Sequence, residues 1–135
     1  MTLSASSVKV GDTFSLVLVE DLKRTQIVQY AGASGDYNPL HTDEVFATQV
    51  AGYPSVFAHG MLTMGMTGRV VTDWVGAERL LSYGGRFVKQ VFPGDALTAR
   101  AEVTSVDGGV VSFKVSTTNQ NGDEVFTGTA TARTD

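Results

Sequence analysis

The N-terminal part of the chain shows two hydrophobic periods in succession. Apolar and polar side chains alternate over residues 13–20, which predicts a strand. Over residues 24–34 the apolar positions recur at helical spacing, which predicts a helix. The start of this helix is poorly signalled because Lys23 stands where an N-cap acceptor is expected, and Asp21 is the alternative cap.

Two more helices are predicted in the middle of the chain. Thr42 is a good N-cap for a short helix that ends near Val50, and Asp43 and Glu44 place acidic side chains in its first turn. Residues 59–74 predict the longest helix. Its apolar side chains lie on most of its sides, so we expect it to be buried inside the protein.

From residue 80 onward the period of the apolar positions is two. This pattern predicts an antiparallel meander, in which Asn121-Gly122 is the strongest hairpin signal. Gly84-Gly85, inside the first of these strands, indicates a bulge or a close approach of two backbones. The predicted strands cover residues 80–92, 96–106, 111–117 and 124–133.

The meander determines the predicted fold class. An antiparallel sheet has an apolar face that must be covered, and the helix over residues 59–74 is the obvious cover. The fold class is therefore α+β, with an antiparallel sheet of about five strands curled around a buried central helix. A length of 135 residues is enough for one domain with its own core, so we expect residues 1–135 to form a single domain.

Composition and charge narrow the choice of partners and compartment. The net charge is −4 and there is no basic stripe, which argues against nucleic acid as the main partner. The absence of cysteine excludes disulfides and thiolate chemistry. Residues 1–10 lack an apolar signal core, and the longest apolar-leaning stretch, residues 59–75, is too short for a bilayer span. We therefore expect a cytoplasmic protein without a membrane partner.

An acid and an imidazole stand five residues apart at Asp36 and His41. Pro39 lies between them, has no backbone N–H and pushes Asn38 out of the helical region, so a regular helix over this stretch is disfavoured. A compact non-helical segment can aim both side chains at one point, which suits shared handling of a water molecule. Taken alone, however, such a segment is more often a simple turn whose aspartate caps a helix.

The motif around these two residues is similar to that of a known family. The run Tyr30–His41 followed by Ala58–Leu62 resembles the MaoC-like family of R-specific enoyl-CoA hydratases and (3R)-hydroxyacyl-ACP dehydratases, which have the hotdog fold. Arg86-Phe87 and Phe92–Asp95 match the family's later strand and turn. Within the family, Ala58–Gly65 and Thr72–Gly76 most resemble the catalytic B subunit of mycobacterial (3R)-hydroxyacyl-ACP dehydratases.

The resemblance implies a role for each residue of the motif. It implies that Asp36 and His41 act together through a water, with syn addition across a double bond conjugated to a thioester. Gly60 would begin the central helix, where its backbone N–H is free to stabilise an oxyanion. Asn38 would support the loop or Asp36 rather than react. His59 is expected to be structural, through a hydrogen bond to a loop carbonyl.

The same resemblance implies the substrate and the partners. The substrate would be an acyl thioester of CoA or of an acyl-carrier protein, with Gly68, Val71 and Trp74 as candidates for the acyl wall. Glycine at position 68, where relatives often have serine, would leave the acyl pocket roomier. No cofactor and no metal are expected. A homodimer is expected, or instead a heterodimer with a related subunit.

The chain also departs from the family, and two alternative functions stay open. Gln90 replaces a usual proline, which affects the bend of a strand near the pocket, and Lys23 replaces a hydroxyl residue. A non-catalytic tunnel subunit of a heterodimeric dehydratase is one alternative, although it would not need both Asp36 and His41. A hotdog thioesterase is the other, although residues 61–72 offer no acid for its central helix.

Overall fold

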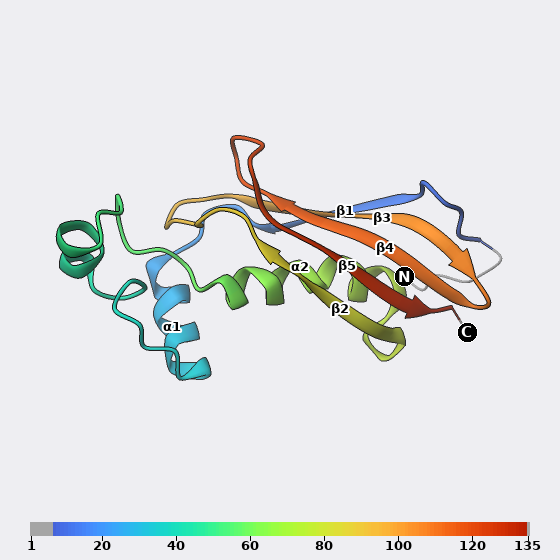
Figure 1. The fold of residues 1–135 in the computed structure, drawn as a ribbon, viewed down its shortest axis with the longest axis horizontal. Coiled ribbons are helices and arrows are strands. Elements are labelled where there is room, and N and C mark those ends of the chain that lie inside the picture. The colour runs from blue at the N-terminus through green and yellow to red at the C-terminus, as the bar shows by residue number, and fades with distance from the viewer. Residues whose placement is uncertain (1–6, 135) are drawn as a thin grey trace.

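The computed structural model describes residues 7–134, so residues 1–6 of the polar N-terminal stretch lie outside the described part. An antiparallel sheet of five strands forms one layer, in the order β1-β3-β4-β5-β2 (Figure 1). In residues 7–134 no helix is long and apolar enough to cross a bilayer. The strands are β1 (Thr13–Val19), β2 (Leu80–Phe87), β3 (Leu97–Asp107), β4 (Val110–Thr118) and β5 (Glu124–Arg133).

The long helix α2 (Gly60–Val75) lies along one face of the sheet, as Figure 1 shows. Inward side chains of β3, β4 and β5 alternate with outward ones and close over the helix. Trp74 of α2 stacks on Phe14 of β1 with ring centroids 5.7 Å apart, and its ring lies 5.4 Å from that of Phe113. The predicted α+β sheet around a central helix is confirmed.

The helix is buried less completely than its sequence predicts. Thr67, Val70 and Val75 face the sheet and are fully buried. Met61 is 56% exposed, and other apolar residues of the first two turns are only partly buried. In the single chain α2 therefore covers the sheet with one side and leaves apolar surface on its other side.

The helix α1 (Arg24–Ser34) and the chain from residue 35 to residue 58 lie beyond one end of the sheet (Figure 1). At the start of α1, the Lys23 N–H donates to the side chain of Gln26 at 3.0 Å. Gln26 therefore completes the helix start, while Asp21 forms an ion pair with the Lys23 side chain.

The short helix after His41 begins later than predicted. Residues 44–50 are helical and include a π-helical turn, Phe46–Val50. Asp43, not Thr42, caps it, because the Phe46 N–H donates to Asp43 Oδ1 at 3.1 Å. The backbone N–H of Thr42 is instead bonded to the Pro39 carbonyl at 3.3 Å, so the turn that follows the proline delays the helix.

The strand predicted over residues 80–92 ends at Phe87. The prediction was therefore wrong for residues 88–92. The N–H groups of Val88 and Lys89 still donate to the Val125 carbonyl, at 2.9 and 3.4 Å. Because β5 begins only at Glu124, the residues after Lys89 have no strand to pair with. The chain instead crosses toward α2, where the Val91 carbonyl accepts a hydrogen bond from the Ala58 N–H at 2.7 Å. A 3₁₀ turn, Ala77–Arg79, joins α2 to β2.

The glycine pair in β2 marks a close approach of two backbones, and the register shift of this strand lies elsewhere, between Leu80 and Ser82. Gly85 stands opposite Gly128 of β5. A Cβ added at Gly85 would lie 2.3 Å from the Thr127 carbonyl oxygen, whereas one added at Gly84 would meet no atom within 4 Å.

Gly85→Ala is therefore expected to destabilise the protein by roughly 1–3 kcal/mol, because the clash is with backbone and cannot be relieved by a rotamer change. Urea denaturation of the purified variant measures this loss. Gly84→Ala is the matched control and should change the free energy of unfolding by less than about 0.5 kcal/mol. Equal effects of the two substitutions would contradict the close approach.

Candidate active site

The segment after α1 is a compact turn held by its own side chains. Gly35 ends α1 in the left-handed region, with φ of 76°, and its N–H donates to the Ala31 carbonyl. Asp36 Oδ1 accepts from the Asn38 N–H at 3.2 Å, and Asn38 Oδ1 accepts from the Leu40 N–H at 3.0 Å. The Asn38 side chain therefore braces the turn, and the turn places the exposed Asp36 carboxylate.

His41 follows this turn and is 9% exposed. Its Nδ1 lies 2.6 Å from the carbonyl oxygen of Phe57. A carbonyl can only accept, so Nδ1 carries the proton and donates it. In the neutral ring the other nitrogen, Nε2, then keeps its lone pair, which is the form that a general base needs.

His59 approaches the same turn from the other side of the segment. It stands at the N-cap of α2, is 2% exposed, and its Nε2 lies 3.0 Å from the carbonyl oxygen of Asp36. The predicted hydrogen bond to a loop carbonyl is therefore present. The rings of His59 and His41 are stacked, with centroids 3.8 Å apart and planes inclined by 22°.

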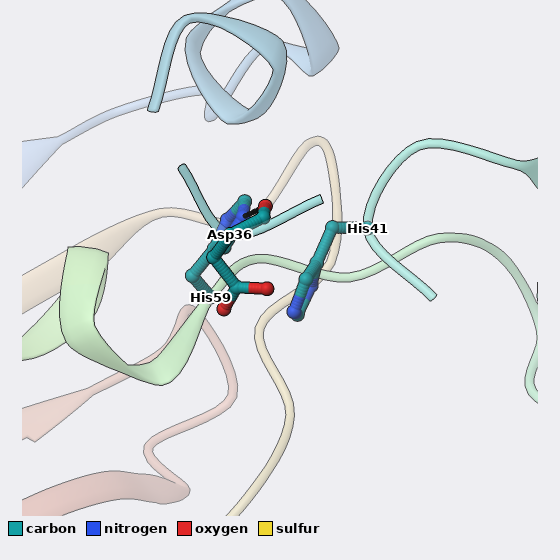
Figure 2. Close-up of side chains that lie close together, drawn as sticks. All are labelled: Asp36, His41 and His59. Carbon is teal, nitrogen blue, oxygen red and sulfur yellow. Dashed lines mark hydrogen bonds between the residues drawn. The ribbon is translucent and has the colours of Figure 1, made fainter. Parts of the chain in front are cut away.

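Asp36, His41 and His59 converge, as Figure 2 shows, with the Asp36 carboxylate facing the His41 ring. One carboxylate oxygen and one nitrogen from each ring lie within 4.8 Å of one another. A water with two hydrogen bonds of about 2.8 Å bridges polar atoms up to about 5.6 Å apart. A metal ion needs lone pairs that converge on one point, whereas stacked rings direct theirs side by side, so the arrangement suits a water better than a metal.

Gly60, next to His59, is the first residue of α2. Among the residues that the structure describes, no acceptor is bonded to its N–H, as expected for the first turn of a helix. A Cβ at this position would lie 2.9 Å from the ring of Phe87, so glycine allows that ring to pack directly on the helix start. The N–H and the helix dipole both favour a partial negative charge here.

A cavity of about 230 Å³ adjoins Gly60. Its wall is mostly apolar. The side chains come from the segment before α2, from β2 and the segment after it, and from β5. Lys89 stands at this wall and forms an ion pair with Asp123 at 2.7 Å, which lowers the pKa of that carboxyl. The lining residues are Phe57, Ala58, Gly60, Thr63, Phe87, Val88, Lys89, Gln90, Val91 and Val125.

The acyl-wall candidates do not line this cavity. Val71 and Trp74 lie in the core between α2 and the sheet, 1% and 6% exposed. At Gly68 the space left by the missing side chain is next to the ring of Tyr83, whose nearest atom would lie 3.3 Å from an added Cβ. Burial raises the pKa of Tyr83 to about 12, so its hydroxyl stays protonated and donates to the Met64 carbonyl at 2.6 Å.

Two features of the site have little or no signal in the sequence. The Phe57 carbonyl, which fixes the His41 tautomer, is a main-chain atom, and no residue type signals it. The contact of Phe87 with Gly60 joins β2 to α2, and the family resemblance at Arg86-Phe87 is its only sequence signal.

Comparison with known proteins places the chain in a family. A profile described as a MaoC like domain matches residues 6–125, which is most of the chain. The chain belongs to the MaoC-like family. The 3-hydroxyacyl-thioester dehydratase Y of Mycobacterium tuberculosis is 41% identical over 90 residues, which cover 56% of this chain and 31% of that protein. The MaoC-like chain described here spans less than a third of the length of such curated relatives.

Solved structures of similar proteins share the fold of this MaoC-like chain. The R-hydratase PhaJ1 from Pseudomonas aeruginosa is 25% identical, with a TM-score of 0.84 over 99% of this chain and 88% of that one. A chain of the ChsH1-ChsH2 complex from Mycobacterium tuberculosis is 29% identical, with a TM-score of 0.81 over 95% of this chain and 99% of that one. The predicted hotdog fold is thus confirmed.

Proposed function

We propose that this MaoC-like protein catalyses the reversible hydration of trans-2-enoyl thioesters, which in reverse is the dehydration of (3R)-3-hydroxyacyl thioesters. The observation that carries the proposal is the convergence of the Asp36 carboxylate and the His41 imidazole at water-bridging distance. The family membership and the similar dehydratase and R-hydratase support it.

Each group has a role in this scheme. His41 Nε2 takes a proton from the water while the Asp36 carboxylate accepts the water's other hydrogen bond and sets its direction. The water oxygen bonds to the β-carbon, and negative charge moves to the thioester oxygen, where the Gly60 N–H donates to it. The proton taken from water is then given to the α-carbon on the same face, so that one molecule of water is added.

The substrate in this scheme is an acyl thioester of CoA or of an acyl-carrier protein. The apolar cavity beside Gly60 is next to the oxyanion donor, where the part of the substrate around the thioester must lie. The chemistry requires only proton transfers and charge stabilisation, so the scheme uses no cofactor. Gly68, Val71 and Trp74 remain candidates for contact with longer acyl chains, at a greater depth along α2.

A second hotdog chain, either a copy or a related subunit, is proposed to complete the assembly. β2 is an edge strand, and Leu81 and Phe87 on it are each more than half exposed. Met61 of α2 adds exposed apolar surface. The similar ChsH1-ChsH2 structure is a complex of two different chains, which supports assembly with a related subunit.

The direct test is hydration of crotonyl-CoA by the purified protein, followed as loss of the conjugated enoyl absorbance. We expect hydration by the chain alone or after mixing with a related subunit. Release of free CoA in the same mixture would instead indicate a thioesterase. No reaction with short or long enoyl-CoA, with and without the related subunit, would contradict the proposal and favour a non-catalytic subunit.

A further inference from the structure

His59 has a buried side chain at the site, but it takes part in no step of the proposed reaction. It is 2% exposed and stands at the N-cap of α2, directly before Gly60. Its own carbonyl accepts from the N–H groups of Leu62 and Thr63, so it also begins the hydrogen bonding of the helix. The main chain of His59 is thus fixed relative to the oxyanion donor.

The side chain of His59 holds the main chain at Asp36. The His59 Nε2 lies 3.0 Å from the main-chain carbonyl oxygen of Asp36. Because a carbonyl only accepts, this nitrogen must carry the proton and donate it. The other nitrogen, Nδ1, is buried and has no hydrogen-bond partner among the described residues. The ring therefore makes a single directed contact, and that contact is with the residue that carries the carboxylate.

The face of the same ring lies against His41. The stacked rings, 3.8 Å between centroids, leave the His41 imidazole no freedom to swing toward His59. The opposite constraint on His41 is the hydrogen bond from Nδ1 to the Phe57 carbonyl. On α1, Tyr30 meets the His59 ring edge-on at 4.8 Å and so holds His59 itself in place.

We propose that His59 is a positioning residue that sets the separation of the Asp36 carboxylate, the His41 imidazole and the Gly60 N–H. Its hydrogen bond holds Asp36, its ring face holds His41, and its main chain leads directly into Gly60. This inference rests on the proposed function. A displacement of about 1 Å between reacting groups costs up to about 10²-fold in rate, so one residue that is joined to all three, by its side chain to Asp36 and His41 and by its main chain to Gly60, has a large effect on turnover.

Two substitutions separate the two side-chain contacts. His59→Phe keeps a ring face against His41 and removes the donor to Asp36. His59→Gln keeps a donor and removes the ring face. We expect each to lower kcat for crotonyl-CoA by roughly 10-fold to 10²-fold while KM changes by less than about threefold. Asp73→Asn, whose exposed carboxylate lies on α2 and pairs with Arg69, is the control and should leave both parameters unchanged.

A spectroscopic measurement distinguishes positioning from a general effect on folding. Proton–nitrogen correlation spectra of the His41 ring report its Nδ1–H bond to Phe57 without turnover. We expect this signal to shift or broaden in His59→Gln and to persist in His59→Phe. Failure of the wild type to hydrate any enoyl-CoA would contradict the proposed function. A shift of the His41 signal in His59→Gln would in that case still support the contact between the two rings.

Three results would overturn the role of His59. The first is a kcat within about twofold of wild type in both folded variants. The second is a loss of activity that is explained by loss of folded protein, whether thermal denaturation shows partial or complete unfolding of both variants. His59 would then be merely structural. The third is an unchanged His41 signal in His59→Gln.

Discussion

Replacement of either member of the Asp36–His41 pair is expected to lower kcat for crotonyl-CoA hydration by about 10²–10⁴-fold, because in the proposed reaction each handles the same water in the same step. Asp36→Asn keeps the acceptor for the Asn38 N–H, so the turn should survive the loss of charge. His41→Asn keeps a donor for the Phe57 carbonyl and removes the nitrogen that acts as base. Steady-state kinetics with purified variants measures both losses.

The double variant provides the sharper test of joint action. Since the proposed reaction has the two groups act on one water, Asp36→Asn combined with His41→Asn should lose about as much activity as the less active single variant. Asp73→Asn on α2 is the control, because its carboxylate is exposed and pairs with Arg69 at the surface. Losses that multiply in the double variant, or activity retained in either single one, would contradict a shared water.

Gly60→Ala is expected to lower kcat/KM by about 10²-fold, which is the scale of losing an oxyanion donor. The substitution keeps the N–H but places a Cβ where, in the proposed reaction, the thioester approaches. The same Cβ would lie 2.9 Å from the Phe87 ring and force that ring, at the cavity wall, to move. The enoyl-absorbance assay measures the loss, and circular dichroism checks that the helix is intact.

Gly65→Ala is the matched control on the same helix. A Cβ there meets no atom within 4 Å, so activity should be unchanged. The free energy of unfolding should rise by up to about 1 kcal/mol, because alanine is the better helix former. If Gly60→Ala were as active as Gly65→Ala, the helix start would not be the site of the thioester oxygen.

The periodic part of the fold could be predicted because it depends on near neighbours along the chain. Side chains of a strand alternate and those of a helix recur every three or four residues, so β3 and α2 are visible in the sequence. The turn that carries Asp36 was also predictable, since Pro39 acts within its own peptide unit. The His59 bond to a loop carbonyl was expected, but its acceptor was not.

The errors in the bounds of elements concern partners that are distant in sequence or turns that compete with a helix start. The end of β2 at Phe87 depends on where β5 begins, and the cap of the short helix depends on a turn already made by Pro39. The cavity lies beside Gly60, where residues of β2, β5 and the start of α2 meet. None of these contacts has a local pattern that would reveal it.

Short-range sterics and periodicity act within a few residues, so the succession of elements, the family resemblance and the pair Asp36 and His41 could be found in the sequence. The assembly of the site, by contrast, depends on long-range packing. This packing brings His59 onto the ring of His41, the Phe57 carbonyl to its Nδ1, and Phe87 against Gly60. These contacts exist because closing the core brings together segments that local forces leave independent, and the packed interior allows few other arrangements.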